Sequence, residues 1–171
     1  MKELKTDLFE TIYQDDVDAI CITTNGQYTM QGIAAMGGGC AGECARRWPE
    51  TAFRLGKMLK VSKTNIPFVI GALDKEANYL EPTKELIKSK KFKCLIFSFP
   101  TINNIINGAN LQLIKQSATV LKDYIDQYGM KSVICPRMGV GIGGLRWADV
   151  KPEVENILDD RFTIVSFNDE E

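Results

Sequence analysis

The sequence contains no histidine among its 171 residues. Without an imidazole group, a Ser-His-Asp or Cys-His mechanism, a histidine-ligated metal and a histidine general base are all excluded. The five cysteines are odd in number and include no Cys-x-x-Cys pair, the spacing typical of metal sites. Cys21, Cys94 and Cys135 fall in strand-like runs, where free cysteine is a small core residue. We therefore expect no metal site and no cofactor.

Strong net charge and long apolar runs are missing as well. A formal net charge of −1 provides no extended field for a nucleic-acid backbone, so a nucleic-acid role would need a local patch. The candidate patch comprises Lys84, Lys88, Lys90, Lys91 and Lys93. Phe92 is its only interleaved aromatic residue, which favours a solvated helix end. No stretch approaches the ~18 apolar residues that cross a bilayer, and residues 1–10 lack an apolar signal segment, so we expect a cytoplasmic protein without a membrane partner.

Apolar, strand-like runs alternate with helical patterns along the chain. Strands are expected at residues 4–9, 17–23, 68–73, 79–80, 94–99, 133–135 and 162–167. Helices are expected at residues 41–48, 50–59, 82–90, 109–128 and 149–158. Gly129 supplies a stop for the fourth helix, and Asp149 a cap for the fifth. This alternation predicts one domain over residues 1–171, a monomeric three-layer α/β/α sandwich around a mixed, mostly parallel sheet, with an acidic tail at residues 168–171.

Two glycine-rich segments stand out. Residues 36–42 read Met-Gly-Gly-Gly-Cys-Ala-Gly, and residues 139–145 read Gly-Val-Gly-Ile-Gly-Gly-Leu. Each follows a strand-like run and leads towards a helix, an arrangement in which backbone N–H groups converge on a phosphate and the helix adds its positive end. Ligands of such folds bind beyond the carboxyl ends of the strands. Two loops of this kind predict a ligand with two neighbouring phosphates.

Several polar residues lie beside the expected loops. Asp7 follows the first strand, and either accepts the amino group of a base or caps the next turn. Asn25 ends a strand, and either binds a sugar hydroxyl or begins a turn. The segment 26–35, with Tyr28 and Gln31 as its polar candidates, is long enough to act as a cover over a ligand.

Other polar residues are expected to be structural. Asn103 and Asn104 are typical loop formers. Trp147 is expected to pack against the last helix. Arg137 and Arg146 flank the second glycine-rich segment, and either point to solvent or supplement phosphate binding.

In four segments the sequence resembles the macro domain family. These are residues 18–25, 36–41 (Met-Gly-Gly-Gly-Cys-Ala), 99–101 (Phe-Pro-Thr) and 135–150, which contain Gly-Val-Gly-Ile-Gly-Gly-Leu-Arg-Trp-Ala-Asp-Val. Their order and spacing cover nearly the whole chain. Within the family, the chain is most similar to the branch of DNA ADP-ribosyl glycohydrolase antitoxins, terminal ADP-ribose hydrolases and many phage-encoded macro domains. That branch has a comparable Phe-Pro-Thr strand end and a comparable Gly-Leu-x-Trp-x-x-Val segment.

The resemblance implies a cleft for ADP-ribose or one of its derivatives. It assigns Asp7 and Leu8 to the adenine end, and Asn25 to the distal ribose, where it is also the candidate catalytic residue. The first loop then follows the distal ribose and pyrophosphate, and the second wraps the diphosphate. The loop residues assigned in this way are Gly37, Gly38, Gly39, Cys40, Met138, Gly139, Val140, Gly141, Ile142, Gly143, Gly144 and Leu145.

Three positions depart from the pattern of these relatives. Ile22 stands where many macro-domain hydrolases have an asparagine. Gly38 stands where the antitoxin-like branch has its catalytic lysine, and Gly143 where the terminal ADP-ribose hydrolases have a catalytic aspartate. Turnover of an ADP-ribosyl ester on protein or nucleic acid, or of ADP-ribose 1″-phosphate, would then rely on a water oriented by Asn25. The alternatives are a reader or sequestering module without turnover, and a regulatory domain for another nucleotide.

Overall fold

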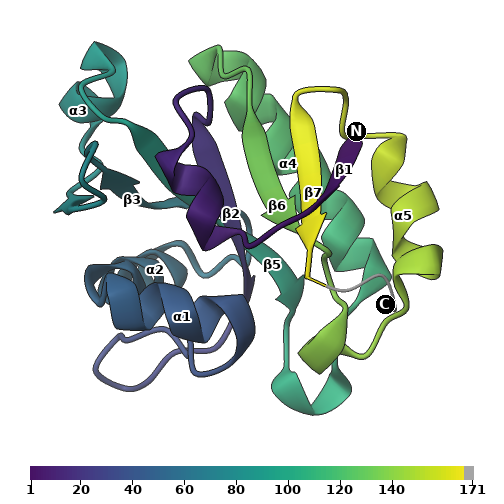
Figure 1. Cartoon of the computed structure of the whole chain (residues 1–171). Coiled ribbons are helices and arrows are strands. Elements are labelled where there is room, and N and C mark those ends of the chain that lie inside the picture. Colours follow the sequence, from purple (N-terminus) through teal and green to yellow (C-terminus); the bar gives the residue numbers. More distant parts are fainter. Residues whose placement is uncertain (168–171) are drawn as a thin grey trace.

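A computed structural model describes residues 1–167, in which strands and helices alternate (Figure 1). The strands are β1 (Lys2–Lys5), β2 (Ala19–Asn25), β3 (Val69–Leu73), β4 (Tyr79–Leu80), β5 (Cys94–Ile102), β6 (Val133–Pro136) and β7 (Phe162–Ser166). The α-helices are α1 (Gly39–Arg47), α2 (Glu50–Ser62), α3 (Lys84–Ser89), α4 (Leu111–Tyr128) and α5 (Trp147–Glu155). Three short 3₁₀ turns are η1 (Phe9–Tyr13), η2 (Ile105–Asn107) and η3 (Gly141–Gly143). The acidic tail expected at residues 168–171 lies outside the described residues.

The seven strands form one mixed sheet in the order β1-β7-β6-β2-β5-β3-β4. Neighbouring strands from β1 to β5 in this order are parallel, whereas β3 is antiparallel to both β5 and β4. The predicted mixed, mostly parallel sheet is confirmed. Because parallel strands point the same way, the carboxyl ends of β1, β7, β6, β2 and β5 all lie at one edge of the sheet.

Each face of the sheet packs against its own set of helices, which gives the predicted three layers (Figure 1). Ile20 and Ile22 of β2 belong to the cluster that contains Leu55 of α2 and Cys44 of α1. The alternating residues of the same strand, such as Cys21, belong to the opposite cluster, with α4 and α5. This period of two is what a strand buried on both faces requires.

The predicted end of the first strand is wrong. The first strand was expected over residues 4–9, but β1 ends at Lys5 and a 3₁₀ turn begins at Phe9. The Oδ1 atom of Asp7 accepts a hydrogen bond from the Phe9 N–H at 2.9 Å, which bends the chain out of the sheet.

The strand expected to end before Pro100 continues to Ile102. Proline donates no ladder hydrogen bond, but Pro100 lies beside an irregularity where the register with β2 shifts between Thr24 and Asn25. Its carbonyl oxygen accepts a hydrogen bond from the Ser117 hydroxyl of α4 at 2.7 Å. The bulge therefore accommodates a proline in a central strand.

Helix ends follow the expected chemistry, with one correction. Gly129 adopts the left-handed conformation (φ 65°) that ends α4, as predicted. Asp149 was expected to cap the last helix, but α5 begins at Trp147, and Asp149 lies in its first turn. There it pairs with the Arg146 guanidinium, with Nε 2.8 Å from Oδ2. A carboxylate in the first turn still complements the helix dipole.

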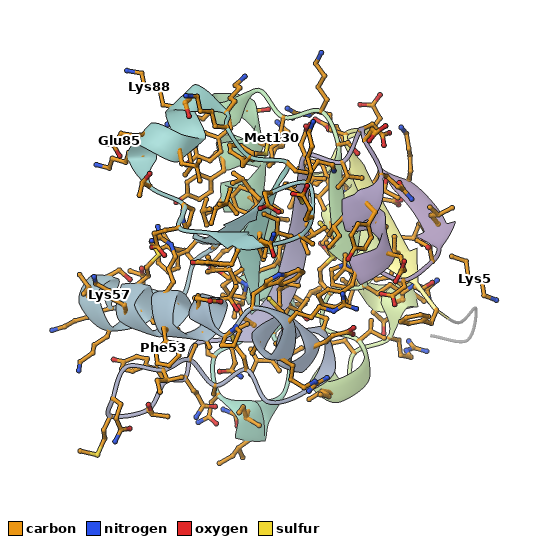
Figure 2. All side chains as sticks on the ribbon, turned by 60° about the vertical axis from the view of Figure 1, so that its left-hand side comes forward. Lys5, Phe53, Lys57, Glu85, Lys88 and Met130 are labelled. Atoms are coloured by element: carbon orange, nitrogen blue, oxygen red, sulfur yellow. The ribbon has the colours of Figure 1, made fainter. Side chains whose placement is uncertain are left out.

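The second half of the segment 26–35 is held against α2, whereas residues 27–31 are exposed. The Ala34 N–H donates to the Ala52 carbonyl oxygen at 3.0 Å. At Gly56 of α2, a Cβ atom would lie 2.0 Å from the carbonyl oxygen of Gly32. The outer side of α2 carries exposed side chains, including Phe53 and Lys57 (Figure 2). Only glycine at position 56 allows the segment to approach the helix so closely.

Gly56→Ala should destabilise the protein by about 3 kcal/mol, because backbone atoms must move to admit the methyl group. Helix propensity alone predicts the opposite sign, a gain of about 1 kcal/mol. Urea unfolding of both proteins, followed by far-UV circular dichroism, measures the difference. Gly37→Ala is the matched control, since a Cβ there meets no atom within 4 Å. A stabilised Gly56→Ala protein would show that the segment does not lie on α2.

Candidate functional site

A cavity of about 1040 Å³ opens at the carboxyl ends of β1, β2, β5, β6 and β7, and we call it the cleft. The residues assigned to a ligand that line it are Asp7, Leu8, Asn25, Gly37, Gly38, Gly39, Cys40, Gly139, Val140, Gly141, Ile142 and Gly143. Met138, Gly144 and Leu145 do not line it. Met138 is fully buried in the core, and a Cβ at Gly139 would meet Leu145 at 3.0 Å, so these two support the second loop from beneath.

The first glycine loop leads directly into α1, whose N-terminus opens into the cleft. Gly38 occupies the N-cap position of α1 and has no side chain to cap the helix. The first intrahelical bond at this end runs from the Gly42 N–H to the Gly38 carbonyl oxygen, so the preceding N–H groups have no intrahelical acceptor. A Cβ at Gly42 would lie 2.8 Å from the Gly37 carbonyl oxygen, which shows how tightly the loop folds on its helix. This end of the cleft attracts an anion.

The second glycine loop forms the 3₁₀ turn η3 and is fastened at both ends. The Leu145 N–H donates to the Gly139 carbonyl oxygen, and the Ala109 N–H donates to the Gly143 carbonyl oxygen. Gly141 adopts φ 75°, and a Cβ there would meet no atom within 4 Å. Position 141 thus requires glycine because of its backbone conformation, and not because a side chain would lack space. The helix that follows, α5, begins at Trp147, which does not line the cleft, so the second loop acts without the helix end expected for it.

The side chain of Ile142 reaches across from the second loop to the first. A Cβ at Gly38 would lie 2.9 Å from the Cδ1 atom of Ile142, and one at Gly39 would lie 3.7 Å from it. Ile142 is nevertheless 70% exposed, so it bridges the two loops from the solvent side. Any residue larger than glycine at position 38 would displace this bridge. The two loops therefore enclose the space between them from both sides.

Asp7 lies at one end of the cleft, at the carboxyl end of the edge strand β1. Its single hydrogen bond to the described part of the chain is the one from the Phe9 N–H, which uses Oδ1. The interpretation that Asp7 caps the next turn is thus correct for its Oδ1 atom. The other oxygen, Oδ2, has no partner within residues 1–167 and can accept a hydrogen bond from a ligand.

Asn25 lies at the carboxyl end of β2 and fastens both ends of the segment 26–35. Its Oδ1 accepts from the Gln27 N–H at 2.9 Å, and its Nδ2 donates to the Ala35 carbonyl oxygen at 3.1 Å. Residues 33–35 line the cleft, whereas Tyr28 and Gln31 do not. The segment therefore contributes backbone and small apolar side chains to the cleft wall, instead of the polar side chains considered from the sequence.

Sequence reasoning missed the two threonines before Asn25. The Thr23 hydroxyl lies 3.2 Å from the Cys40 sulfur, and both residues line the cleft. Thr24 is only 5% exposed, and its hydroxyl oxygen has no hydrogen-bond partner among the described residues. A buried hydroxyl without a partner is costly, and a ligand in the cleft could satisfy it. The polar run Thr-Thr-Asn that ends an otherwise apolar strand was the signal for it.

The thiols in and near the cleft are weak acids. Burial raises the pKa of Cys40, although the hydrogen bond with Thr23 opposes this shift in part. Burial raises the pKa of Cys44, one turn further along α1, to about 12. Both thiols therefore remain protonated at neutral pH, and neither is an activated nucleophile. Within residues 1–167, no group of histidine, cysteine or acidic side chains could hold a metal ion.

The residues flanking the second loop are mostly structural. Trp147 is buried, and its indole N–H donates to the Glu3 carboxylate at 2.7 Å. Hydrogen bonds from Lys151 and Trp147 lower the pKa of Glu3. The Arg137 guanidinium lies 5.7 Å from the centre of the Trp147 ring, and Arg137 also lines the cleft. Of the two flanking arginines, only Arg137 is thus within reach of a ligand.

The remaining sequence candidates have roles outside the cleft. The Oδ1 of Asn104 accepts from the Ile106 N–H, and the Oδ1 of Asn103 accepts from the Nδ2 of Asn65. Both asparagines are loop formers, as expected. In the part of the chain that the structure describes, no helix has the length and apolar character that crossing a membrane requires.

Solved structures resemble the chain along almost its whole length. Thermosipho africanus DarTG in complex with ADP-ribose matches with a TM-score of 0.72 and 19% sequence identity, over 95% of this chain and 40% of that one. The macrodomain of Mycobacterium tuberculosis DarG matches with a TM-score of 0.68 and 24% identity, over 96% of this chain and 95% of that one.

The macrodomain of Thermus aquaticus DarG matches with a TM-score of 0.68 and 22% identity, over 96% of this chain and 95% of that one. No family model matches the sequence, and no curated protein matches it. The structural likeness at this level of identity confirms the fold that the sequence resemblance implied. The protein has the macrodomain fold, with a seven-stranded mixed sheet between two layers of helices.

Proposed function

We propose that the cleft binds ADP-ribose or a derivative of it, with the diphosphate between the two glycine loops. The observation that carries this proposal is that both loops line one cavity and are bridged across it by Ile142. Amide groups from two sides suit a ligand with two adjacent phosphates better than a monophosphate. ADP-ribose is also the ligand of the Thermosipho africanus DarTG structure that shares the fold.

The strand order supports an extended ligand that runs along the sheet edge. Asp7 follows β1 and Asn25 follows β2, and β7 and β6 lie between these strands. Three strand spacings separate the two residues by roughly 14 Å. The second glycine loop follows β6 and thus lies between them. This arrangement suits a ligand with a nucleoside at one end, a sugar at the other and a diphosphate between them.

The adenine end is proposed to lie at Asp7. Its Oδ2 can accept a hydrogen bond from the exocyclic amino group, while Oδ1 keeps the bond from the Phe9 N–H. Leu8 and Phe9 line the same end and are buried apolar residues. A flat base gains from such apolar contact, and the carboxylate distinguishes an amino group from a carbonyl.

Binding without rapid turnover is the function that the cleft supports best. The groups with an acidic proton that line it are the carboxyl groups of Asp7 and Glu43 and the thiol of Cys40. Glu43 pairs with Arg47 at 2.9 Å, and the Cys40 thiol stays protonated because burial raises its pKa. None of these groups is a free general base beside Asn25. We infer a module that reads or sequesters ADP-ribose-type nucleotides.

Slow hydrolysis of an ADP-ribose derivative is the second candidate, and the geometry of Asn25 favours it. Two hydrogen bonds fix the Asn25 amide, so its remaining N–H has a set direction at the end of the cleft. A preorganised donor of this kind can orient a water or a ribose hydroxyl.

The isolated protein should bind ADP-ribose with micromolar affinity, about −8 kcal/mol, and AMP far more weakly, because AMP lacks the second phosphate and the distal ribose. Gly141→Glu should abolish this binding in isothermal titration calorimetry, because a carboxylate would enter the amide cradle. Gly141→Ala is the matched control: it shares the cost of a positive φ, about 1–2 kcal/mol, without the charge. Equal binding of AMP and ADP-ribose would contradict the two-loop site.

Thr24→Val should weaken ADP-ribose binding by about 1 kcal/mol and leave the free energy of unfolding equal or higher, because it removes a buried hydroxyl that lacks a partner. Thr51→Val is the control, for which the opposite pattern of binding and stability is expected. The Thr51 hydroxyl is buried but donates to the Trp48 carbonyl oxygen at 2.7 Å, and Thr51 does not line the cleft. That variant should lose stability and keep binding. Calorimetry and urea unfolding of both variants decide whether Thr24 faces the ligand.

Turnover can be tested on ADP-ribosylated protein, ADP-ribosylated DNA, ADP-ribose 1″-phosphate and O-acetyl-ADP-ribose. If a substrate is hydrolysed, Asn25→Ala should lower its rate by about 10²–10³-fold and keep most of the ground-state binding. Gln27→Ala is the control, because it also removes a side-chain hydrogen bond of the segment 26–35. Gln27 accepts a hydrogen bond from the Ile105 N–H and does not line the cleft. An equal loss of rate in both variants would show that Asn25 has no specific role in the reaction. If the wild type hydrolyses none of these substrates, the protein is a binding module.

A further inference from the structure

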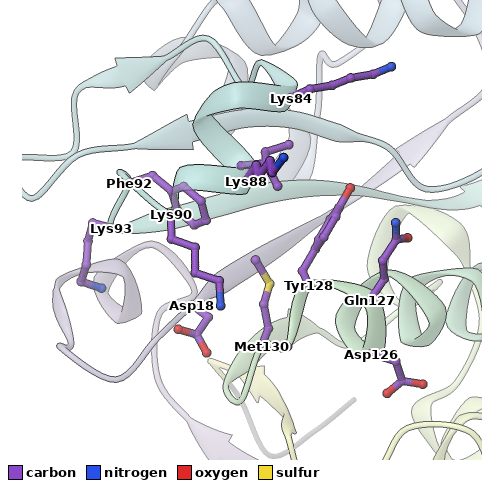
Figure 3. Close-up of a pocket in the computed structure, with 12 residues that line it drawn as sticks. Asp18, Lys84, Lys88, Lys90, Phe92, Lys93, Asp126, Gln127, Tyr128 and Met130 are labelled. Carbon is purple, nitrogen blue, oxygen red and sulfur yellow. The ribbon is translucent and has the colours of Figure 1, made fainter.

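A second cavity, of about 780 Å³, lies at the opposite edge of the sheet from the cleft, and we call it the basic hollow. It is lined by residues of α3, by residues 90, 92 and 93 before β5, by residues 126–130 at the end of α4 before β6, and by Asp18 before β2 (Figure 3). These segments all precede strands, whereas the cleft lies where strands end. The proposed ADP-ribose site therefore does not account for the basic hollow.

Four lysines are among the residues that line the basic hollow. Lys84, Lys88 and Lys90 are exposed, and none of them forms an ion pair with a described residue. Lys93 also lines it, but its ammonium group donates to three backbone carbonyl oxygens, those of residues 12, 14 and 17. Three ammonium groups around one hollow are thus without an ion-pair partner among residues 1–167.

The two acidic residues of the hollow are already engaged. Asp126 pairs with Arg161 at 2.6 Å and with Lys122 at 3.3 Å. The Oδ2 of Asp18 accepts hydrogen bonds from the backbone N–H groups of residues 131 and 132. The carboxylate of Asp126 is thus neutralised by two cations, whereas Asp18 keeps its negative charge in the wall of the hollow. The three lysines still outnumber this one charge.

Helix stability explains only Lys88 of the three lysines, because Lys88 lies in the last turn of α3, where the helix dipole favours a cation. Lys84 and Lys88 are four residues apart on α3, where like charges repel. Lys84 is also the first residue of the helix, at the end that favours negative charge. Lys90 has φ 56°, a conformation that glycine adopts more easily. At positions 84 and 90 the sequence therefore carries positive charge where local structure favours other residues.

Aromatic side chains complete the wall. Phe92 and Tyr128 are half-buried and line the hollow together with the lysines (Figure 3). The Tyr128 ring stacks against the Tyr124 ring, with 5.8 Å between centres, which holds it in place. From the sequence, Phe92 was the only aromatic residue in the lysine segment, and the fold adds Tyr128 from α4. Surfaces that bind single-stranded nucleic acid combine cationic side chains, which contact the phosphate backbone, with aromatic rings, which stack on the bases.

We propose that the basic hollow is a second binding site, separate from the cleft, for single-stranded nucleic acid. Ammonium groups of Lys84, Lys88 and Lys90 contact backbone phosphates, and a base lies against Phe92 or Tyr128. Three separated point charges suit successive phosphates of a strand better than the single phosphate of a mononucleotide. Such contacts do not select a sequence.

The test is fluorescence anisotropy of a labelled ten-nucleotide oligothymidylate between 50 and 200 mM salt. The wild type should bind it, and the affinity should fall as salt rises. Lys84→Gln/Lys88→Gln/Lys90→Gln should reduce the slope of log affinity against log salt by about 2, because each lost phosphate contact removes about 0.7. Its binding at 50 mM salt should be weaker than that of the wild type by at least about 20-fold. Tyr128→Leu should weaken binding about threefold and leave the salt slope unchanged.

The matched control is Lys57→Gln/Lys60→Gln/Lys75→Gln, which removes the same charge at exposed lysines outside the hollow. Figure 2 shows Lys57 on α2, well away from Lys88 on α3. The control should bind the strand like the wild type. Equal weakening in both triple variants would overturn the proposal, and so would thymidine monophosphate that binds as tightly as the strand.

ADP-ribose calorimetry separates this proposal from the one for the cleft. The variant with three substitutions in the hollow should bind ADP-ribose like the wild type, which also shows that it is folded. Saturating ADP-ribose should leave oligothymidylate bound, and displacement would put the strand in the cleft and contradict the proposal. Should the triple variant fail to fold, Lys88→Gln alone should reduce the salt slope by about 0.7, and an unchanged slope would count against the site.

Discussion

The parallel pairing of β2 with β5 and β6 is the constraint on which the rest of the molecule depends. Most residues of these strands are buried, so the register of the pairs is fixed by packing on both faces of the sheet. Parallel pairing brings the carboxyl ends of the strands to one edge, and the two glycine loops with them. The opposite edge gathers the segments that precede the strands. The cleft and the basic hollow therefore lie at opposite edges for one topological reason.

The cleft itself depends on close approaches that only glycine permits. Gly42 lets the first loop fold on α1, Gly38 leaves room for Ile142, and Gly56 lets the segment 26–35 lie on α2. These contacts are between backbone and backbone or between backbone and one side chain, so the wall of the cleft has little freedom to move. A preformed wall suits the proposed ligand, since the binding energy need not be spent on ordering the loops.

The order of elements and the position of both loops could be predicted from the sequence, because periodicity and glycine runs are local signals. The path of β5 through Pro100 could not, since it depends on a bulge opposite Thr24 in another strand. The orphaned hydroxyl of Thr24 likewise depends on what surrounds it in space. Tyr128 joins the lysine segment only through the fold. The sequence offered a turn cap as one alternative for Asp7 and a turn residue as one for Asn25, but the bond from Asn25 to the Ala35 carbonyl oxygen across the loop needed the structure.

A crystal structure with ADP-ribose tests the central claim most directly. The account predicts the diphosphate between residues 37–40 and 139–143, within hydrogen-bond distance of backbone N–H groups on both loops. It predicts the adenine amino group at the Oδ2 of Asp7, and a ligand or water oxygen at the Thr24 hydroxyl. A diphosphate that contacts only one loop, or an ADP-ribose bound outside the cleft, would contradict it.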